Sequence, residues 1–379
     1  MAQAMINSRM LSWARERAGL SLAILAEKLK QPEEKVRAWE DGETRPTFRQ
    51  AQQYAHHAHV PFGYLFLREP PDEDVPIPDL RTVGDHASPG LSVDLKDVLR
   101  DVWRRQLWYR DYQKAMEAEP VAVVGRAQAS WPVAEIVEDI RRWLDVPRHP
   151  ERGNWEAYYR DLIRRIEGLG ILVMRSGIVG NNTRRLLRVE EFRGFAIADP
   201  LVPVIFINAA DVPEARLFTL LHELAHIWLG ESGISDGDPA NRQQTERICN
   251  AVAAEFLVPE DEFLPLWRDL EHWEHNLAPL AAHFHVSQWV VARRALELGM
   301  LTEETYRRYV AKRLKMHRER EPGGQASFTR AVPGRVSRRL AQAVASEALS
   351  GRLLLRDAYQ LIGVRPHRLK EFARKELGL

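Results

Sequence analysis

The spacing of apolar residues divides the first part of the chain into short helices. Helical spacing recurs in "LSWARERAG", "SLAILAEKLK", "PEEKVRAWEDG" and "TFRQAQQYAHHAHV", and "PFGYLFL" follows. Ser21 and Thr47 stand at N-cap positions of two of these stretches, and Gly19 follows the end of another. The pattern predicts a five-helix unit over residues 1–70. A linker rich in Pro and Asp follows at 71–91.

The rest of the chain mixes helical periodicity with short β-type runs. Residues 92–168 show three helical patterns, and "GILVMRS", "FRGFAIAD" and "VPVIFIN" then read as strands. Helical patterns return in "EARLFTLLHELAHIWLG", "QQTERICNAVAAEFLVP" and residues 276–315. These predict an α+β domain with a small sheet over 92–315, in which "VPVIFIN" is a candidate edge strand for pairing with a peptide. Beyond the break "EPGGQASF", residues 330–379 predict a small basic helical unit. The whole chain is expected to be multidomain and mainly α.

Composition narrows the class of protein. A chain of 379 residues is long enough for two or three domains. The single cysteine, Cys249, excludes an internal disulfide and suits a reducing cytosol. No apolar run approaches the roughly 20 residues of a membrane span, and the N-terminus lacks the apolar core of a signal peptide. We therefore expect a cytoplasmic protein without a membrane partner. Residues 301–379 hold 18 Lys+Arg against 8 Asp+Glu, which indicates either an acidic partner or solvated helix faces.

The motif His222-Glu223-x-x-His226 carries the candidate chemistry. Residues four apart share a helix face, so His222 and His226 can direct two imidazoles at one metal ion. Glu223 lies about 100° round the helix, where it can act as a general base beside the open coordination position. The competing interpretation is a core helix with two hydrogen-bonded histidines. That interpretation must bury Glu223 among leucines, which is unfavourable.

Catalytic zinc takes three protein ligands, so a third must come from elsewhere. No histidine lies between Gly230 and Leu270, which leaves the downstream carboxylates. These are Glu231, Asp236, Asp238, Glu246, Glu255, Glu260, Asp261 and Glu262. Glu246 is favoured because Asn250, one turn later on the same predicted helix, could hydrogen-bond a ligand histidine. The sequence leaves Zn²⁺ and Mn²⁺ both open as the metal.

On these residues the chain resembles the ImmA/IrrE family of bacterial metallopeptidases. The resemblance rests on "FRGFAIAD", "FINAAD", "RLFTLLHELAHIWLG" and "ERICNAVAAEFLVP". It extends to "SLAILAEKLKQPEEKVRAWEDGETRPT", which is similar to the helix-turn-helix of phage-type (Xre) repressors. The family implies a zincin-type peptidase core with His222, His226 and Glu246 as ligands and Glu223 as base. It also implies an Xre-type repressor as the protein substrate.

In a repressor helix-turn-helix the second helix enters the major groove of double-stranded DNA with its first residues. Here that helix opens with two glutamates, which disfavour approach to phosphates although a glutamate can read cytosine. The module could instead bind a protein or form a homodimer. The candidate DNA contacts are Glu33, Glu34, Lys35, Arg37, Arg45 and Arg49.

Two functions from different classes follow from these observations. The first is a zinc endopeptidase that cuts a regulatory protein involved in transcription or a stress response. The alternative is a one-chain transcription regulator whose metal domain senses or stabilises without proteolysis. Glu223 favours the enzyme, since a sensor needs ligands but no base. A place in a toxin–antitoxin or phage-defence operon is a further hypothesis that the chain itself does not address.

Overall fold

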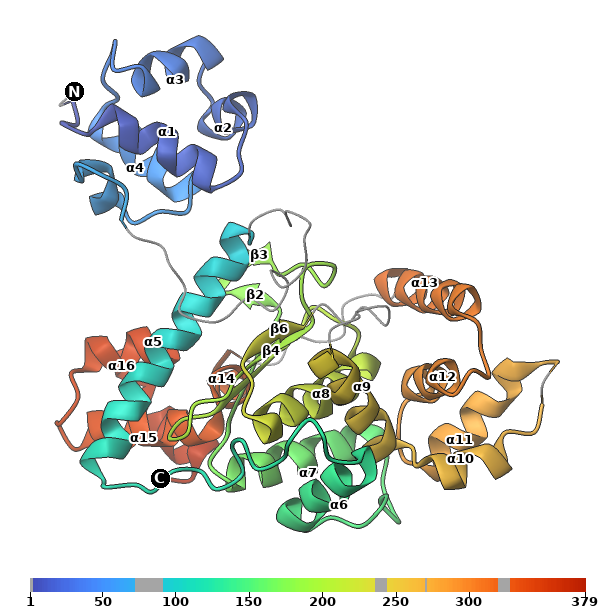
Figure 1. Ribbon diagram of the computed structural model, residues 1–379. Coiled ribbons are helices and arrows are strands. Elements are labelled where there is room, and N and C mark those ends of the chain that lie inside the picture. Colours follow the sequence, from blue (N-terminus) through green and yellow to red (C-terminus); the bar gives the residue numbers. More distant parts are fainter. Residues whose placement is uncertain (1–2, 72–90, 236–243, 270, 320–327) are drawn as a thin grey trace. The chain divides into compact units, whose positions relative to one another are not determined.

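A computed structural model describes residues 3–71, 91–235, 244–269, 271–319 and 328–379 (Figure 1). The chain forms two compact units. Of the described residues, 3–71 and 91–100 belong to one unit, and those from 101 to 379 belong to the other. The predicted linker and the predicted break at "EPGGQASF" lie almost wholly outside the described residues.

The N-terminal unit has four α-helices and one short 3-10 helix around its own apolar core. They are α1 (Ser8–Arg17), α2 (Leu22–Leu29), α3 (Glu33–Glu40), α4 (Phe48–His57) and η1 (Phe62–Phe66). The side chains of Ser21 and Thr47 accept hydrogen bonds from backbone N–H groups of the first turns of α2 and α4, so both predicted caps are confirmed. The fifth predicted helix is the 3-10 turn. Trp39 and Tyr54 are buried at the centre of the unit, where the Tyr54 hydroxyl donates to the Leu11 carbonyl at 2.9 Å.

A four-stranded mixed sheet stands in the larger unit, in the order β1-β5-β4-β6. Its strands are β1 (Leu172–Ser176), β4 (Gly194–Ile197), β5 (Val204–Asn208) and β6 (Gly233–Ser235). β5 runs parallel to β1, and β4 runs antiparallel to both β5 and β6. A separate hairpin joins β2 (Ile178–Val179) to β3 (Asn182–Leu186). The three predicted strands correspond to β1, β4 and β5, whereas the short β2, β3 and β6 were not predicted.

The expectation that "VPVIFIN" forms an edge strand is wrong. The strand it forms, β5, lies between β1 and β4, and all five of its residues are buried. Its backbone groups already bond to two neighbouring strands, so none is left for a peptide. The five consecutive apolar or amide residues fit this interior position, because a strand buried on both faces shows no polar alternation.

Helices cover the sheet and build most of the larger unit (Figure 1). They are α5 (Val93–Ala115), whose residues from Asp101 on belong to this unit, α6 (Val133–Leu144), α7 (Trp155–Gly168), η3 (Pro213–Ala215), α8 (Arg216–Leu229), α9 (Gln244–Leu257), α10 (Glu260–Leu266), η4 (Trp273–Asn276), α11 (Leu277–His283), α12 (Gln288–Glu297) and α13 (Glu303–Glu319). α8 packs against β4 and β5 and also against α9, which in turn contacts α6 and α12. This packing places α8 inside the main apolar core.

The C-terminal helices pack onto the edge of the same sheet. They are α14 (Phe328–Val336), α15 (Arg338–Leu349), α16 (Leu355–Ile362), η5 (Pro366–Arg368), α17 (Leu369–Phe372) and the π-helical turn η6 (Ala373–Leu377). α14 and α15 contact β1, and the Ser337 hydroxyl and the Arg338 backbone N–H donate to the buried Glu167 carboxylate at the end of α7. Among the described residues, no helix has the length and apolar character needed to cross a bilayer.

Candidate metal centre

Helix α8 carries the two histidines and the glutamate of the motif inside the protein core. Every residue from Thr219 to Trp228 is buried. The helix ends at Gly230, whose φ of +72° is a left-handed conformation that favours glycine. A Cβ at Gly230 would also lie only 2.9 Å from the Gly125 Cα. A tight stop at Gly230 therefore fixes the C-terminal end of the helix near His226.

The structure brings His222 and His226 together with Glu246 of α9. The two Nε2 atoms lie 3.2 Å apart. The His222 Nε2 lies 3.2 Å from the Glu246 Oε2, and the His226 Nε2 lies 3.2 Å from the Glu246 Oε1. Tetrahedral ligands at about 2.0–2.1 Å from zinc stand roughly 3.3 Å from one another. The three donors therefore already have the mutual spacing of zinc ligands, and both their chemistry and their geometry fit a divalent metal ion.

Helix α9 supplies both Glu246 and Asn250, one turn apart. The Asn250 Oδ1 lies 3.1 Å from the His222 Nδ1, which leaves the Nε2 of that ring to face Glu246. The Ser235 hydroxyl of β6 lies 3.0 Å from the same Nε2. Burial raises the pKa of Glu246, but hydrogen bonds from His222 and His226 outweigh it and hold that pKa well below its usual range.

Of the eight carboxylates considered from sequence, Glu246 is the one that joins the histidines within the described residues. Glu255 pairs instead with Arg294, and Glu231 accepts a hydrogen bond from the Thr245 hydroxyl at 2.8 Å. Asp236 and Asp238 lie outside the described part of the chain. Cys249 belongs to the apolar core, where burial raises the pKa of its thiol.

Glu223 is fully buried beside these donors, under strand β4. Neither of its carboxylate oxygens makes a hydrogen bond of normal geometry, and burial raises the pKa of the group to about 8. A Cβ on Gly194 would lie 2.6 Å from Glu223 Oε1 and 2.9 Å from the Phe206 carbonyl oxygen. Gly194 therefore allows β4 to pass close over the carboxylate. Sequence reasoning missed this residue, although a glycine inside the strand pattern "FRGFAIAD" is a signal of close backbone approach.

Residues 166–296 match the family model of the IrrE N-terminal-like domain, a metallopeptidase family. The matched range contains both α8 and α9 and all four strands of the sheet. Residues 336–375 match a second family, which is described only as a domain of unknown function. No curated protein matches the chain. Neither matched range includes the N-terminal unit.

A cavity of about 240 Å³ opens beside His222 and Glu223. Part of its wall comes from the matched IrrE N-terminal-like domain, and the remainder comes from α13, beyond that range. The wall is mainly apolar and aromatic in area, with three arginines that each pair with an acidic side chain. Its residues away from the metal donors include Arg193, Phe218, Trp289, Arg293, Tyr306 and Val310. Sequence reasoning missed these residues because they carry no motif.

Two of the three arginines of the cavity wall, Arg193 and Arg293, are held both by an acidic side chain and by an aromatic ring. Arg193 donates to the buried Asp211 at 2.8 Å and faces the Trp289 ring. Arg293 donates to Glu297 at 3.1 Å and lies over the Phe218 ring, 5.0 Å from its centroid. Fixed in this way, both side chains form a rigid wall next to the metal donors.

The candidate DNA contacts lie on α3, in the segment after it and in the first turn of α4. Glu34, Lys35, Arg45 and Arg49 are exposed, whereas Glu33 is half-buried. Arg37 is exposed but donates to Glu33 at 2.8 Å, one turn earlier on the helix. The basic groups of this surface are therefore partly neutralised by acidic neighbours.

Proposed function

We propose that the protein is a zinc-dependent endopeptidase that cuts a regulatory protein. His222, His226 and Glu246 would hold the metal, with Asn250 orienting His222, and Glu223 would act as the general base. The observation that carries the proposal is the donor triangle, in which each pair of the groups His222, His226 and Glu246 has a 3.2 Å contact, beside a buried carboxylate without a hydrogen bond of normal geometry. The match of this region to a metallopeptidase family supports it.

A zinc ion bound here would supply Lewis-acid chemistry, polarising a substrate carbonyl and making water more acidic. Glu223 then accepts a proton from the attacking water as the new C–O bond forms. It delivers that proton to the leaving nitrogen as the C–N bond breaks, so the carboxylate ends in its starting state. Burial raises the pKa of Glu223 to about 8, so its ionised form is a stronger base than a carboxylate in water. A cation bound beside it would favour that ionised form at neutral pH.

The cavity beside Glu223 is the place for a substrate side chain. An apolar cavity of about 150 Å³ holds a benzene ring, so a volume of about 240 Å³ accommodates a large aliphatic or aromatic side chain. Phe218, Trp289 and Val310 provide the apolar contacts. We therefore propose cleavage next to a bulky apolar residue.

The N-terminal unit is proposed to be a helix-turn-helix that binds DNA or a related repressor domain. Its α2 and α3 are joined by three residues, of which Lys30 is in the left-handed conformation, and α3 has an exposed face. An Xre-type repressor as substrate follows from the family resemblance. A helix-turn-helix on the peptidase would bring it to the same DNA or the same partner as that substrate.

A peptide library made from a bacterial proteome tests the enzyme directly. The library is incubated with zinc-loaded wild type and Glu223→Gln, and new termini are identified by mass spectrometry. We expect cleavage by the wild type only, while both proteins hold the same metal at the donor triangle. Equal cleavage by Glu223→Gln would mean that another group is the base. No cleavage by either protein would favour the one-chain regulator.

Metal content tests the ligand set separately from catalysis. Zinc is measured by mass spectrometry on wild type, His226→Ala and Glu246→Ala, each purified without added metal. Each substitution removes one of three ligands, so we expect both variants to lose the zinc of this centre. A full complement of zinc in Glu246→Ala would move the third ligand to another residue.

A further inference from the structure

A second convergence of metal-type donors lies on the surface of the larger unit, and its three residues belong to separate elements. His149 lies in the segment 145–154 between α6 and α7, Glu262 lies in α10, and His283 is the last residue of α11. We propose that these three residues bind a second divalent first-row metal ion, for which Zn²⁺ is the probe. The site shares no residue with the centre on α8, and the proposal stands independently of the proposed peptidase activity.

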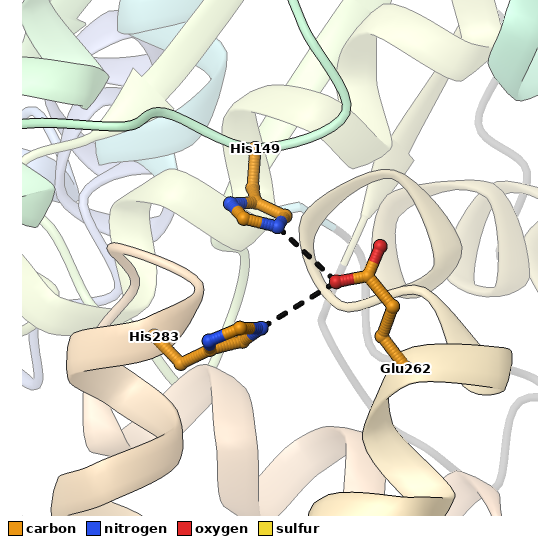
Figure 2. Close-up of side chains that lie close together, drawn as sticks. All are labelled: His149, Glu262 and His283. Carbon is orange, nitrogen blue, oxygen red and sulfur yellow. Dashed lines mark hydrogen bonds and ion pairs between the residues drawn. The ribbon is translucent and has the colours of Figure 1, made fainter.

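The donor atoms converge on one point. The His149 Nε2 lies 3.1 Å from the Glu262 Oε2, and the His283 Nε2 lies 3.4 Å from the same oxygen. Figure 2 shows both imidazole rings directed at this oxygen from different elements. Ligands of a tetrahedral zinc ion lie roughly 3.3 Å apart, and the two observed distances lie on either side of that value. Two imidazoles and one carboxylate are also a common donor set for zinc and its neighbours in the first row.

Surrounding groups hold each donor in this orientation. The Arg148 Nε lies 3.0 Å from the Glu262 Oε1, which leaves Oε2 for the histidines. The buried Phe284 presents its ring edge-on to both imidazoles, with centroid distances of 5.8 Å to His149 and 4.7 Å to His283. A carboxylate oriented by an outer partner, and rings fixed by packing, are features that strengthen metal sites.

Charge and exposure also suit a cation with water in its remaining positions. The positive charge of Arg148 is shared with Asp261, with which it forms an ion pair, so it opposes a nearby metal only weakly. The side chains of His149 and Glu262 are each 26% exposed and that of His283 is 43% exposed. Water can therefore complete the coordination. An ion here would tie the segment before α7 to α10 and α11.

A third group, Asp269, His272 and His275, provides a matched control. It also offers two imidazoles and one carboxylate, here from an aspartate, but both histidines are about 70% exposed and all three residues lie within seven positions of one another. The Asp269 carboxylate already accepts the His272 backbone N–H at 2.7 Å. This group lacks the convergence of separate elements and the buried packing that fix the first one. We expect no tight metal site there.

The test counts zinc on the full chain at a buffered free concentration of about 10 µM, where a site with a Kd of about 1 µM is roughly nine-tenths filled. Wild type, His149→Gln/His283→Gln and the control His272→Gln/His275→Gln are compared by mass spectrometry. We expect the first variant to hold about one zinc ion fewer per chain than both wild type and control. Equal zinc in wild type and the first variant would overturn the proposal. An equal loss in the control would overturn it as well, because the zinc would then belong to surface histidines in general.

Two further variants show which of the two proposed sites holds the zinc that is counted. His283→Gln alone removes the most exposed ligand and should also lower the count, with an unchanged unfolding midpoint in chelator as the check on folding. His222→Gln/His226→Gln addresses the other centre. If it loses no zinc while His149→Gln/His283→Gln does, the proposed peptidase centre fails and the second site stands. If only His222→Gln/His226→Gln loses zinc, the second site fails and the peptidase centre stands.

Discussion

Gly194 offers a sharp test of how the fold positions Glu223. Replacing this glycine by alanine adds one methyl group where β4 crosses α8. The added Cβ would lie 2.6 Å from Glu223 Oε1, 2.9 Å from the Phe206 carbonyl oxygen and 2.9 Å from Thr219 Cγ2. One of these neighbours is backbone of the central strand β5, so rotation of a single side chain cannot relieve all the contacts.

The expected loss of folding stability in Gly194→Ala follows from the cost of overpacking a protein core. An extra methylene in a well-packed interior costs about 1–3 kcal/mol, and three contacts below 3 Å place Gly194→Ala toward the upper end. The carboxylate of Glu223 must also move away from the new methyl group. A displacement of about 1 Å in a catalytic group can lower the rate roughly 100-fold. Metal content should stay unchanged, because the three atoms nearest the added Cβ belong to Glu223, Phe206 and Thr219 and not to a metal-donor residue.

Urea unfolding and the peptide-cleavage assay measure the two effects. Gly168→Ala is the matched control, because its added Cβ meets nothing within 4 Å and it lies at the end of α7. We expect the control to be neutral or up to about 1 kcal/mol more stable. A Gly194→Ala protein within about 0.5 kcal/mol of wild type and with full cleavage would refute the close approach of β4 to Glu223.

Three other substitutions test separate parts of the proposal. Asn250→Ala removes the hydrogen-bond partner of the His222 Nδ1 and should weaken zinc binding about 10–100-fold. Competition with a chromophoric chelator measures the Kd for zinc, and an unchanged Kd would exclude the orienting role of Asn250. Val310→Trp should fill the cavity and lower cleavage about tenfold or more with zinc retained, and equal cleavage would mean that substrate side chains lie elsewhere. Glu33→Gln/Glu34→Gln frees Arg37 and should tighten DNA binding in a gel-shift titration if α3 enters the groove; no change would favour a protein partner.

The parts of the structure that sequence predicted are those that local spacing determines. The four-residue separations His222–His226 and Glu246–Asn250 each place two side chains on one helix face, whatever the rest of the fold does. The caps Ser21 and Thr47 act within a single turn and are confirmed for the same reason. The apolar runs of β1, β4 and β5 were also recognisable one by one.

The parts that sequence missed depend on which distant elements meet. The interior place of β5 is set by strand order, which its own residues do not reveal. The cavity wall joins Arg193 to Tyr306, more than 100 positions apart, and neither residue belongs to a motif. The cluster of His149, Glu262 and His283 likewise spans more than 130 positions, so only the folded chain brings it together. The spacing of residues along the sequence cannot predict contacts between residues that are so far apart in the chain.

Helix α8 differs from an ordinary core helix because it buries ionisable side chains, and this difference points to function. Glu223 and His226 are fully buried, and His222 and Glu246 are 4% and 3% exposed, on helices that otherwise bury apolar side chains. Burying an ionised group without a partner costs several kcal/mol. Glu246 offsets this cost through two histidines, but Glu223 has no such compensation. A fold selected for stability alone would place a leucine there, so the carboxylate is best explained by chemistry with a cation beside it. The same cation would neutralise the excess negative charge, which links metal binding to the stability of the whole core.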